Sequence, residues 1–237
     1  MSKLYKLFKI QCYDLLCLLE MEHNGIVFNT EKAMEYANEL EAKLEKLRND
    51  FNNIVGSNIA RISSNDDLSA VLYGGVIVET IRIPVGHYLS GKKKGHVRYK
   101  LEDVHHTFDR LVDPLPKTET DKCVKNREKW DMHQAIGEET ILKEYWEVNE
   151  PVLKSLKARG KARQVIDIVL AYNKMDKLKG TYLEGYTKLI EKQGWKHNML
   201  YGNLNQCVVV TGRLSSNAPN LQNADKETKR YMITRYE

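Results

Sequence analysis

Two apolar repeats constrain the fold more than any other feature of the sequence. The first follows alternating steps of four and three residues: Ala33, Ala37, Leu40, Leu44, Leu47, Phe51 and Ile54. This spacing is a heptad seam, which predicts a helix of about seven turns packed along a partner helix. Residues 162–191 repeat the pattern, with Val165, Ile168, Val169, Tyr172, Met175, Tyr182, Tyr186, Leu189 and Ile190. We therefore expect two long antiparallel helices whose apolar stripes form ordinary core.

The residues before the first seam predict another helix. Residues 3–22 place apolar side chains on one broad helical face: Leu4, Leu7, Phe8, Leu15, Leu18 and Leu19. This pattern predicts a buried amphipathic helix, which Asn24-Gly25 ends. Residues 26–29 read as a short extended piece, and Asn29 or Thr30 can cap the next helix.

Ser63 and Ser64 precede a short helical run that ends at about Leu72. Either serine could cap that helix, with Asp66 and Asp67 in its first turn. Hydroxyls and free N–H groups at a helix N-terminus also bind phosphate, but the two aspartates make capping the better interpretation.

Residues 76–83 and 96–101 predict two strands joined by the compact basic loop Gly91-Lys92-Lys93-Lys94-Gly95. The loop could clamp a DNA backbone, dock an accessory protein, or be a solvated hairpin tip. His105-His106 suggests a metal site, but adjacent histidines on an extended segment point to opposite faces, which favours structural or surface roles. Pro114 and Pro116 predict a linker.

Further helices are expected from Glu138 to about Val148 and after Pro151. The β-branched run at residues 206–210 then predicts a buried strand. It leads into residues 211–223, where Gly212 and Pro219 interrupt regular structure. The polar side chains of this segment are typical readers of nucleic-acid bases and phosphates: Arg213, Asn217, Asn220, Gln222 and Asn223. In the minor groove such groups test base-pair geometry without reading sequence.

The bulk composition limits the class of protein. A net charge of +5 favours a polyanionic partner without establishing one. Lysines and acidic residues interrupt the apolar N-terminus, so no run reaches the about 18 residues that span a bilayer. The sequence has four cysteines, and none has the spacing of metal ligands: Cys12, Cys17, Cys123 and Cys207. We therefore expect reduced thiols with no disulfide and no zinc, in a soluble, untargeted cytoplasmic protein.

The segment Thr211 to Asn223, TGRLSSNAPNLQN, resembles TGRLSS followed by PNLQN in family A DNA polymerases of the DNA polymerase I type. LLEMEHNGIVFN at residues 18–29 resembles the segment before the thumb of that family, and KLKGTY at 177–182 resembles its KLKSTY element. The resemblance implies an α+β fold with a mainly helical thumb, its long antiparallel helix pair, and the first strands of a palm. Residues 76–137 look like an elaboration of phage-type members. The implied domains are residues 1–75 (N-terminal helix and first part of the thumb), 76–137 (β-hairpin insertion), 138–193 (second part of the thumb) and 194–237 (N-terminal portion of the palm).

The resemblance also implies roles for individual residues. Arg213 is expected at the minor-groove edge of the primer terminus, and Lys177 and Lys179 at primer-template phosphates. Ser215 mainly shapes the loop. The remaining expected DNA contacts are Asn220, Gln222, Asn223, Thr181, Ser63 and Ser64.

Catalysis in this family uses two Mg²⁺ ions held by carboxylates. Those carboxylates lie in palm motifs after TGRLSS, and the 237 residues end before any of them. We therefore expect no catalytic residue and no metal ligand among these residues. We expect a naturally split polymerase, whose second polypeptide carries the palm and fingers. If a phage encodes it, we expect it in the cytoplasm of the host cell. The alternative is a non-catalytic duplex DNA-binding module or accessory protein.

Overall fold

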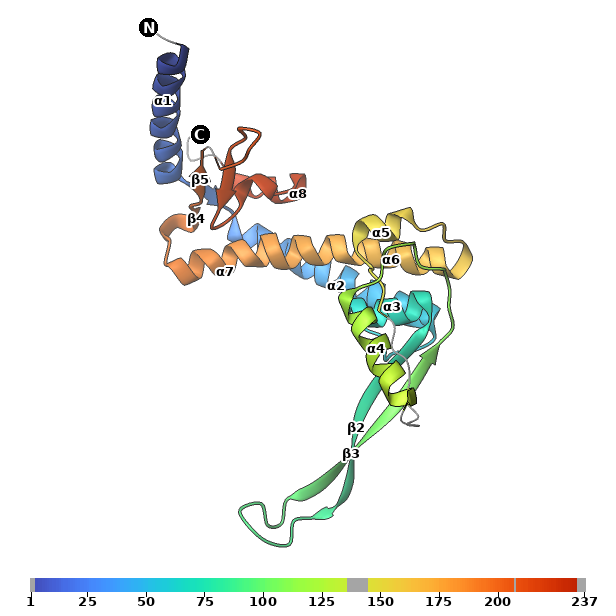
Figure 1. The fold of residues 1–237 in the computed structure, drawn as a ribbon. Helices are drawn as coiled ribbons and strands as arrows, with labels where there is room; N and C mark the ends of the chain where they lie inside the picture. The colour runs from blue at the N-terminus through green and yellow to red at the C-terminus, as the bar shows by residue number, and fades with distance from the viewer. Residues whose placement is uncertain (1–2, 136–144, 207, 234–237) are drawn as a thin grey trace. The chain divides into compact units, whose positions relative to one another are not determined.

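The computed structural model describes residues 3–135, 145–206 and 208–233, and the chain divides into two compact units. Unit 1 comprises residues 1–45 and 174–237, and unit 2 comprises residues 46–173. Figure 1 shows the elements along the chain. Helices and small antiparallel sheets together confirm the predicted α+β class.

Both long helices predicted from the heptad seams are present. The first is α2, Thr30–Val55, and the second runs through α6, Gly160–Lys177, into the π-helix η1, Leu178–Leu183, and α7, Glu184–Gln193. In unit 1, Phe28 contacts Tyr186 and Glu41 pairs with Lys179, so the residue numbers rise in opposite directions. The helices are therefore antiparallel, as the pattern predicts.

The π-helix changes which residues of the second helix face the core. Its wider turn is closed where the Glu184 amide donates to the Lys179 carbonyl oxygen, five residues back. As a result Leu178 and Leu183 are buried beside Tyr182 and Tyr186, although the heptad spacing includes neither leucine. The core of unit 1 forms between this face and the buried stripe of α2.

A small sheet joins three distant parts of unit 1. Strand β1, Ile26–Phe28, lies between β4, Met199–Leu200, and β7, Met232–Ile233, and both pairings are antiparallel. Gly25, directly before β1, has a φ of +60°, and a Cβ there would meet the Tyr201 ring at 2.8 Å. The Asn24-Gly25 stop therefore serves the turn that the sequence predicts and also a close packing contact.

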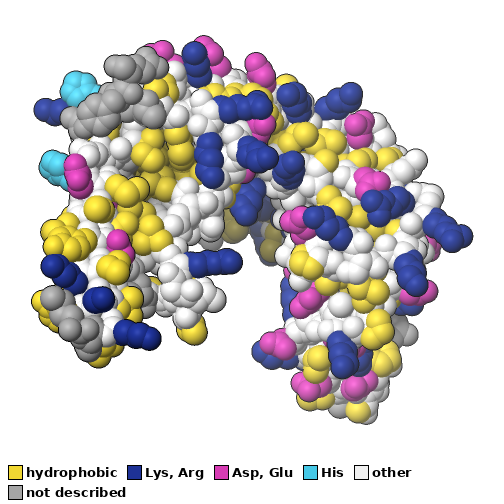
Figure 2. Space-filling view, turned by 90° about the horizontal axis from the view of Figure 1, so that it is seen from above, with side chains coloured by type: hydrophobic (Ala, Val, Ile, Leu, Met, Phe, Trp, Pro, Cys, Tyr) yellow, Lys and Arg dark blue, Asp and Glu magenta, His cyan; other side chains and the backbone are white. Residues whose placement is uncertain are grey.

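Helix α1, Lys3–Asn24, corrects the prediction of a buried amphipathic helix, since none of its residues is buried. Its large apolar side chains are exposed to solvent, among them Leu4, Leu7, Phe8, Leu15 and Leu16. Hydrophobic side chains at the surface are visible in Figure 2. No helix of the described residues is long and apolar enough to cross a membrane.

Unit 2 contains the short helix α3, Asn65–Tyr73, and a ribbon of β2, Gly75–His87, paired with β3, Val97–Phe108. The ribbon confirms the two predicted strands and extends both. The unit also holds helices α4, Asp121–Ala135, and α5, Glu150–Ser155, together with the adjoining parts of α2 and α6. Helix α5 fulfils the prediction of a turn at Pro151.

The helix predicted from Glu138 to Val148 falls largely on residues 136–144, outside the described part of the chain. Its described end, residues 145–148, is not helical. Trp146 instead forms an isolated bridge with Glu119, and the Tyr73 hydroxyl donates to the Glu147 carbonyl oxygen. These contacts hold the segment extended against unit 2, which corrects that part of the prediction.

Candidate nucleic-acid interface

The conspicuous Val208-Val209-Val210 run is exposed and not a strand, which corrects the sequence prediction. The strands of this region are β5, Asn203–Asn205, and β6, Ser215–Asn217, and the described residues 206 and 208–214 between them are not in a strand. Gly212 N–H donates to the Val209 carbonyl oxygen and closes a turn, while Cys207 lies outside the described residues. Pairing of polar β5 with β6 overrides the β-propensity of the valines. The loop carries Arg213 on the surface.

The second half of the motif is fixed to the long helix by two tyrosine hydroxyls. Tyr182 Oη donates to the Asn223 carbonyl oxygen at 2.8 Å, and Tyr186 Oη donates to the Asn220 carbonyl oxygen at 3.4 Å. Burial, with smaller contributions from Tyr182 and Asp225, raises the pKa of Tyr186 to about 12. The Tyr186 hydroxyl therefore stays a protonated donor at neutral pH.

Local hydrogen bonds complete the shape of this segment. Ser216 Oγ accepts from Leu221 N–H and donates to the Pro219 carbonyl oxygen, each at 3.3 Å. At Gly202 an added Cβ would meet Leu221 Cδ1 at 2.9 Å and the Pro219 carbonyl oxygen at 3.1 Å. Only glycine lets the strand pass this close, so the backbone of residues 219–223 is held from two sides.

The predicted DNA-contacting side chains of the motif have different local roles. Asn220 Oδ1 accepts from Asn223 N–H and caps the short 3₁₀ helix η3, Leu221–Asn223. Gln222 and Asn223 are exposed, whereas Ser215 is half-buried in β6. The fixed backbone thus presents the Gln222 and Asn223 amides to solvent.

The predicted phosphate-contacting residues lie around the π-helix. Lys177 and Thr181 are exposed. Lys179 is half-buried and paired with two carboxylates, since its Nζ lies 2.7 Å from Glu184 Oε1 and 2.9 Å from Glu41 Oε2. Hydrogen bonds to Glu184 and then Glu41 raise the pKa of Lys179 above its ordinary value. Lys179 thus has a structural role, and its phosphate contact stays an untested prediction.

Three further lysines were not predicted as a group by the sequence. Lys43 from α2, Lys174 from α6 and Lys226 from α8, Lys226–Lys229, line a cavity of about 560 Å³ whose floor includes Leu40 and Leu178. The carboxylates in its wall have other partners. Asp225 caps α8 through Thr228, and Glu227 pairs with Arg230. The ammonium groups therefore outweigh the available negative charge there. Lys43 follows Leu40 by three residues, so only its place beside the heptad seam could have indicated it.

Ser63 and Ser64 lie in unit 2, not with the motif residues of unit 1. Ser64 caps α3 by accepting from Asp67 N–H, which confirms the capping prediction. Asp67 Oδ2 accepts from Arg61 N–H and Nε–H, both at 3.0 Å. Burial alone would raise the pKa of Asp67, but these hydrogen bonds lower it below its ordinary value. A carboxylate this close disfavours phosphate at the same helix end.

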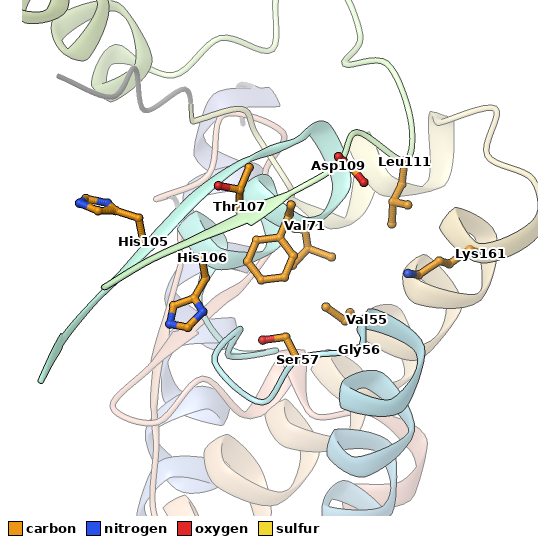
Figure 3. A pocket seen from close by; sticks show the side chains of 11 residues that line it. Val55, Gly56, Ser57, Val71, His105, His106, Thr107, Asp109, Leu111 and Lys161 are labelled. Carbon is orange, nitrogen blue, oxygen red and sulfur yellow. The ribbon is translucent and has the colours of Figure 1, made fainter. Parts of the chain in front are cut away.

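His105 and His106 border a cavity of about 540 Å³ in unit 2, and their rings point in different directions (Figure 3). His106 Nε2 lies 3.1 Å from Glu79 Oε2, and His105 is exposed. Over the described residues, no group of three or more His, Cys, Asp or Glu side chains could hold a metal ion. His106 is thus a ribbon residue that pairs with Glu79, and His105 is a surface residue.

Comparison with known proteins places part of the chain near one enzyme family. The model of DNA polymerase family A matches residues 127–235. DNA polymerase I of Bacillus subtilis is 41% identical over 59 residues, which cover 25% of this chain and 6% of that protein. The thermostable DNA polymerase I of Thermus thermophilus is 38% identical over 73 residues, covering 31% of this chain and 8% of that protein. The chain thus spans less than a tenth of the length of these curated relatives.

A solved structure has a related fold over most of the chain. It is the POL domain of Pol1 from M. smegmatis in complex with DNA primer-template and dNTP. The two share 18% sequence identity with a TM-score of 0.52, over 90% of this chain and 27% of that chain. The family A resemblance is therefore confirmed over residues 127–235, and the fold resembles that of a DNA polymerase POL domain.

Proposed function

We propose that this chain is the primer-template-binding part of a family A DNA-directed DNA polymerase, a nucleotidyltransferase. The observation that carries the proposal is the anchoring of residues 219–223 to the long helix by the Tyr182 and Tyr186 hydroxyls. It fixes the backbone and leaves Gln222 and Asn223 exposed within the segment that matches the family.

Amide and guanidinium donors suit the minor-groove edge of a duplex. Every base pair presents acceptors there at nearly the same place, so Arg213, Gln222 and Asn223 can respond to base-pair geometry without reading sequence. A template-copying enzyme needs that response at the primer terminus. Exposure of Arg213 on the β5–β6 loop leaves its guanidinium accessible for such a contact.

Phosphate contacts would come from the lysines of unit 1. Lys177 is exposed, and Lys43, Lys174 and Lys226 line a cavity whose carboxylates already have partners. Lysine ammonium groups hold phosphates without sequence preference and make binding salt-dependent. In this proposal Lys177 and the cavity lysines bind the backbone, while the motif loop inspects the terminus.

We propose that a second polypeptide with palm and fingers supplies the Mg²⁺ ligands. Bound Mg²⁺ supplies charge neutralisation for nucleotidyl transfer. Helix α1 supports a protein partner, since its apolar side chains are too numerous to remain in water without cost. We also propose that residues 76–137 are a phage-type elaboration and that they bind an accessory factor.

Reconstitution tests this proposal. Primer extension is measured with the chain alone, with a polypeptide carrying the family's palm carboxylates alone, and with both together. Extension that needs both polypeptides is the expected result. If duplex binding persists but no extension arises from the mixture, the chain is a non-catalytic DNA-binding module and the split-enzyme assignment is wrong.

A further inference from the structure

All the Lys, Arg, Asp and Glu residues in the outer part of the β2–β3 ribbon are positively charged. Residues 80–101, which we name the distal ribbon, contain no Asp or Glu and hold six cations: Arg82, Lys92, Lys93, Lys94, Arg98 and Lys100. Acidic residues resume directly outside it, at Glu79 and Glu102. In the whole chain 32 acidic residues accompany 37 Lys and Arg, so the distal ribbon departs sharply from the average composition. Charge is thus segregated along one hairpin.

The tip of the distal ribbon is a defined turn. Tyr88 N–H donates to the His96 carbonyl oxygen, and Gly95 N–H donates to the Tyr88 carbonyl oxygen, each at 2.9 Å. Gly91 and Gly95 have φ angles of +79° and +86°, which glycine adopts without strain. The three lysines between them are exposed, so their ammonium groups project together from a closed loop.

Aromatic rings accompany these charges. Tyr99 is 52% exposed and Tyr88 is 37% exposed. Strand alternation places Val97, Tyr99 and Leu101 on one face of the ribbon and Arg98 and Lys100 on the other. In Figure 1 the other elements of unit 2 lie at the base of the ribbon, so both faces are accessible within that unit.

We propose that the distal ribbon binds single-stranded nucleic acid. Arg82 pairs with Leu101 and therefore lies on the same face of the ribbon as Tyr99, and the three lysines Lys92, Lys93 and Lys94 lie at the tip beyond them. Cations beside exposed aromatic rings are how proteins hold unpaired strands without sequence preference. Tyrosine can stack only on bases whose faces are open, which a duplex does not offer. This inference goes beyond the proposed function, which places duplex contacts on unit 1.

The test measures binding of the 237-residue chain to a fluorescent oligothymidylate and to a blunt duplex, as a function of salt. Replacing Lys92, Lys93 and Lys94 together by Ala should weaken binding to oligothymidylate and reduce its salt slope by about 2, since each lysine–phosphate contact on a single strand contributes about 0.7. Tyr99→Ala should weaken it about 5-fold or more, and Tyr99→Phe should retain it, because stacking needs the ring and not the hydroxyl.

A matched control separates position from net charge. Lys125, Lys129 and Lys157 are exposed lysines of the same unit, and their triple Ala variant removes the same charge. It should bind oligothymidylate like the unchanged chain. Equal losses in both triple variants, or an unchanged salt slope in the tip variant, would overturn the proposal. So would a tip that binds poly-glutamate but not oligothymidylate, which would indicate an acidic protein partner. These results do not depend on primer extension, so they can fail or succeed apart from the polymerase assignment.

Discussion

The Tyr182 hydroxyl donates to the Asn223 carbonyl oxygen at 2.8 Å and thereby joins the π-helical turn to the loop that carries Gln222. This hydrogen bond depends on the position of the π-helix along the long helix. The π-helix spans Leu178–Leu183, and its altered register keeps both Tyr182 and Tyr186 on the buried face while leaving Thr181 exposed. π-Turns are frequent at functional sites, and here the turn holds the backbone of the loop at Asn223.

Tyr182→Phe should destabilise the chain by about 0.5–1.5 kcal/mol, because one hydrogen bond is lost while the ring is kept. It should also slow primer extension in the reconstituted enzyme, since the Gln222 backbone loses an anchor. Tyr172→Phe is the control, because its hydroxyl accepts from Arg48 and not from the loop. Urea unfolding and extension rates check both. If Tyr172→Phe slows extension as much as Tyr182→Phe, the anchoring role is wrong.

Lys177→Ala and Lys179→Ala should have opposite signatures. Lys177 is exposed, so its loss should lower the salt slope of duplex binding by about 1 and leave the unfolding midpoint unchanged. Lys179 is paired with Glu41 and Glu184, so its loss should reduce stability and leave the salt slope unchanged. Salt titrations of binding and thermal unfolding separate the two. A reduced slope for Lys179→Ala would show that it leaves its internal partners to contact phosphate.

Arg213→Ala should reduce the extension rate of the reconstituted enzyme about ten-fold or more, because a hydrogen bond from a charged donor contributes about 1.5–3 kcal/mol. Duplex affinity should change little. Arg230→Ala is the control, since Arg230 is exposed and already pairs with Glu227. Single-turnover extension and equilibrium binding measure the two effects. An unaffected rate would contradict the assignment of Arg213.

Asp67→Asn should lower the free energy of unfolding at neutral pH by about 1–3 kcal/mol, since the buried carboxylate accepts two hydrogen bonds from Arg61. The folded-state pKa of Asp67 lies below its ordinary value of 3.8, so its contribution is present above 3.8 and is lost as the pH falls through the folded value. The unchanged chain and the variant should therefore converge in acid. Asp113→Asn, at an exposed pair, should show no such dependence. A difference that persists at low pH would contradict this account.

Local signals in the sequence predict much of this fold. Most of the seam from Ala33 to Phe51 is buried as its spacing indicates, with Leu47 half-buried. Ser64 and Gly25 occupy the helix ends that their chemistry favours. These features depend on residues a few positions apart. Periodicity and capping rules act over that distance.

Features set by distant contacts could not be read in the same way. The valine run at 208–210 lies in a loop because β5 pairs with β6 around it. Lys179 is held by Glu41 from a different helix, and Asn220 uses its amide as a cap. Helix α1 is exposed although its composition is that of a core helix. In these cases the conformation or exposure of a residue depends on contacts with residues far away in the sequence, or on the lack of such contacts among the described residues.

The central claim is that this chain grips a primer-template duplex. Its most direct test is the fluorescence anisotropy of a recessed-end duplex titrated with the chain over a range of salt concentrations. The account predicts saturable binding that weakens linearly in log–log form with salt and that Lys177→Ala makes less salt-dependent. Absence of affinity for the recessed-end duplex at low salt would contradict it.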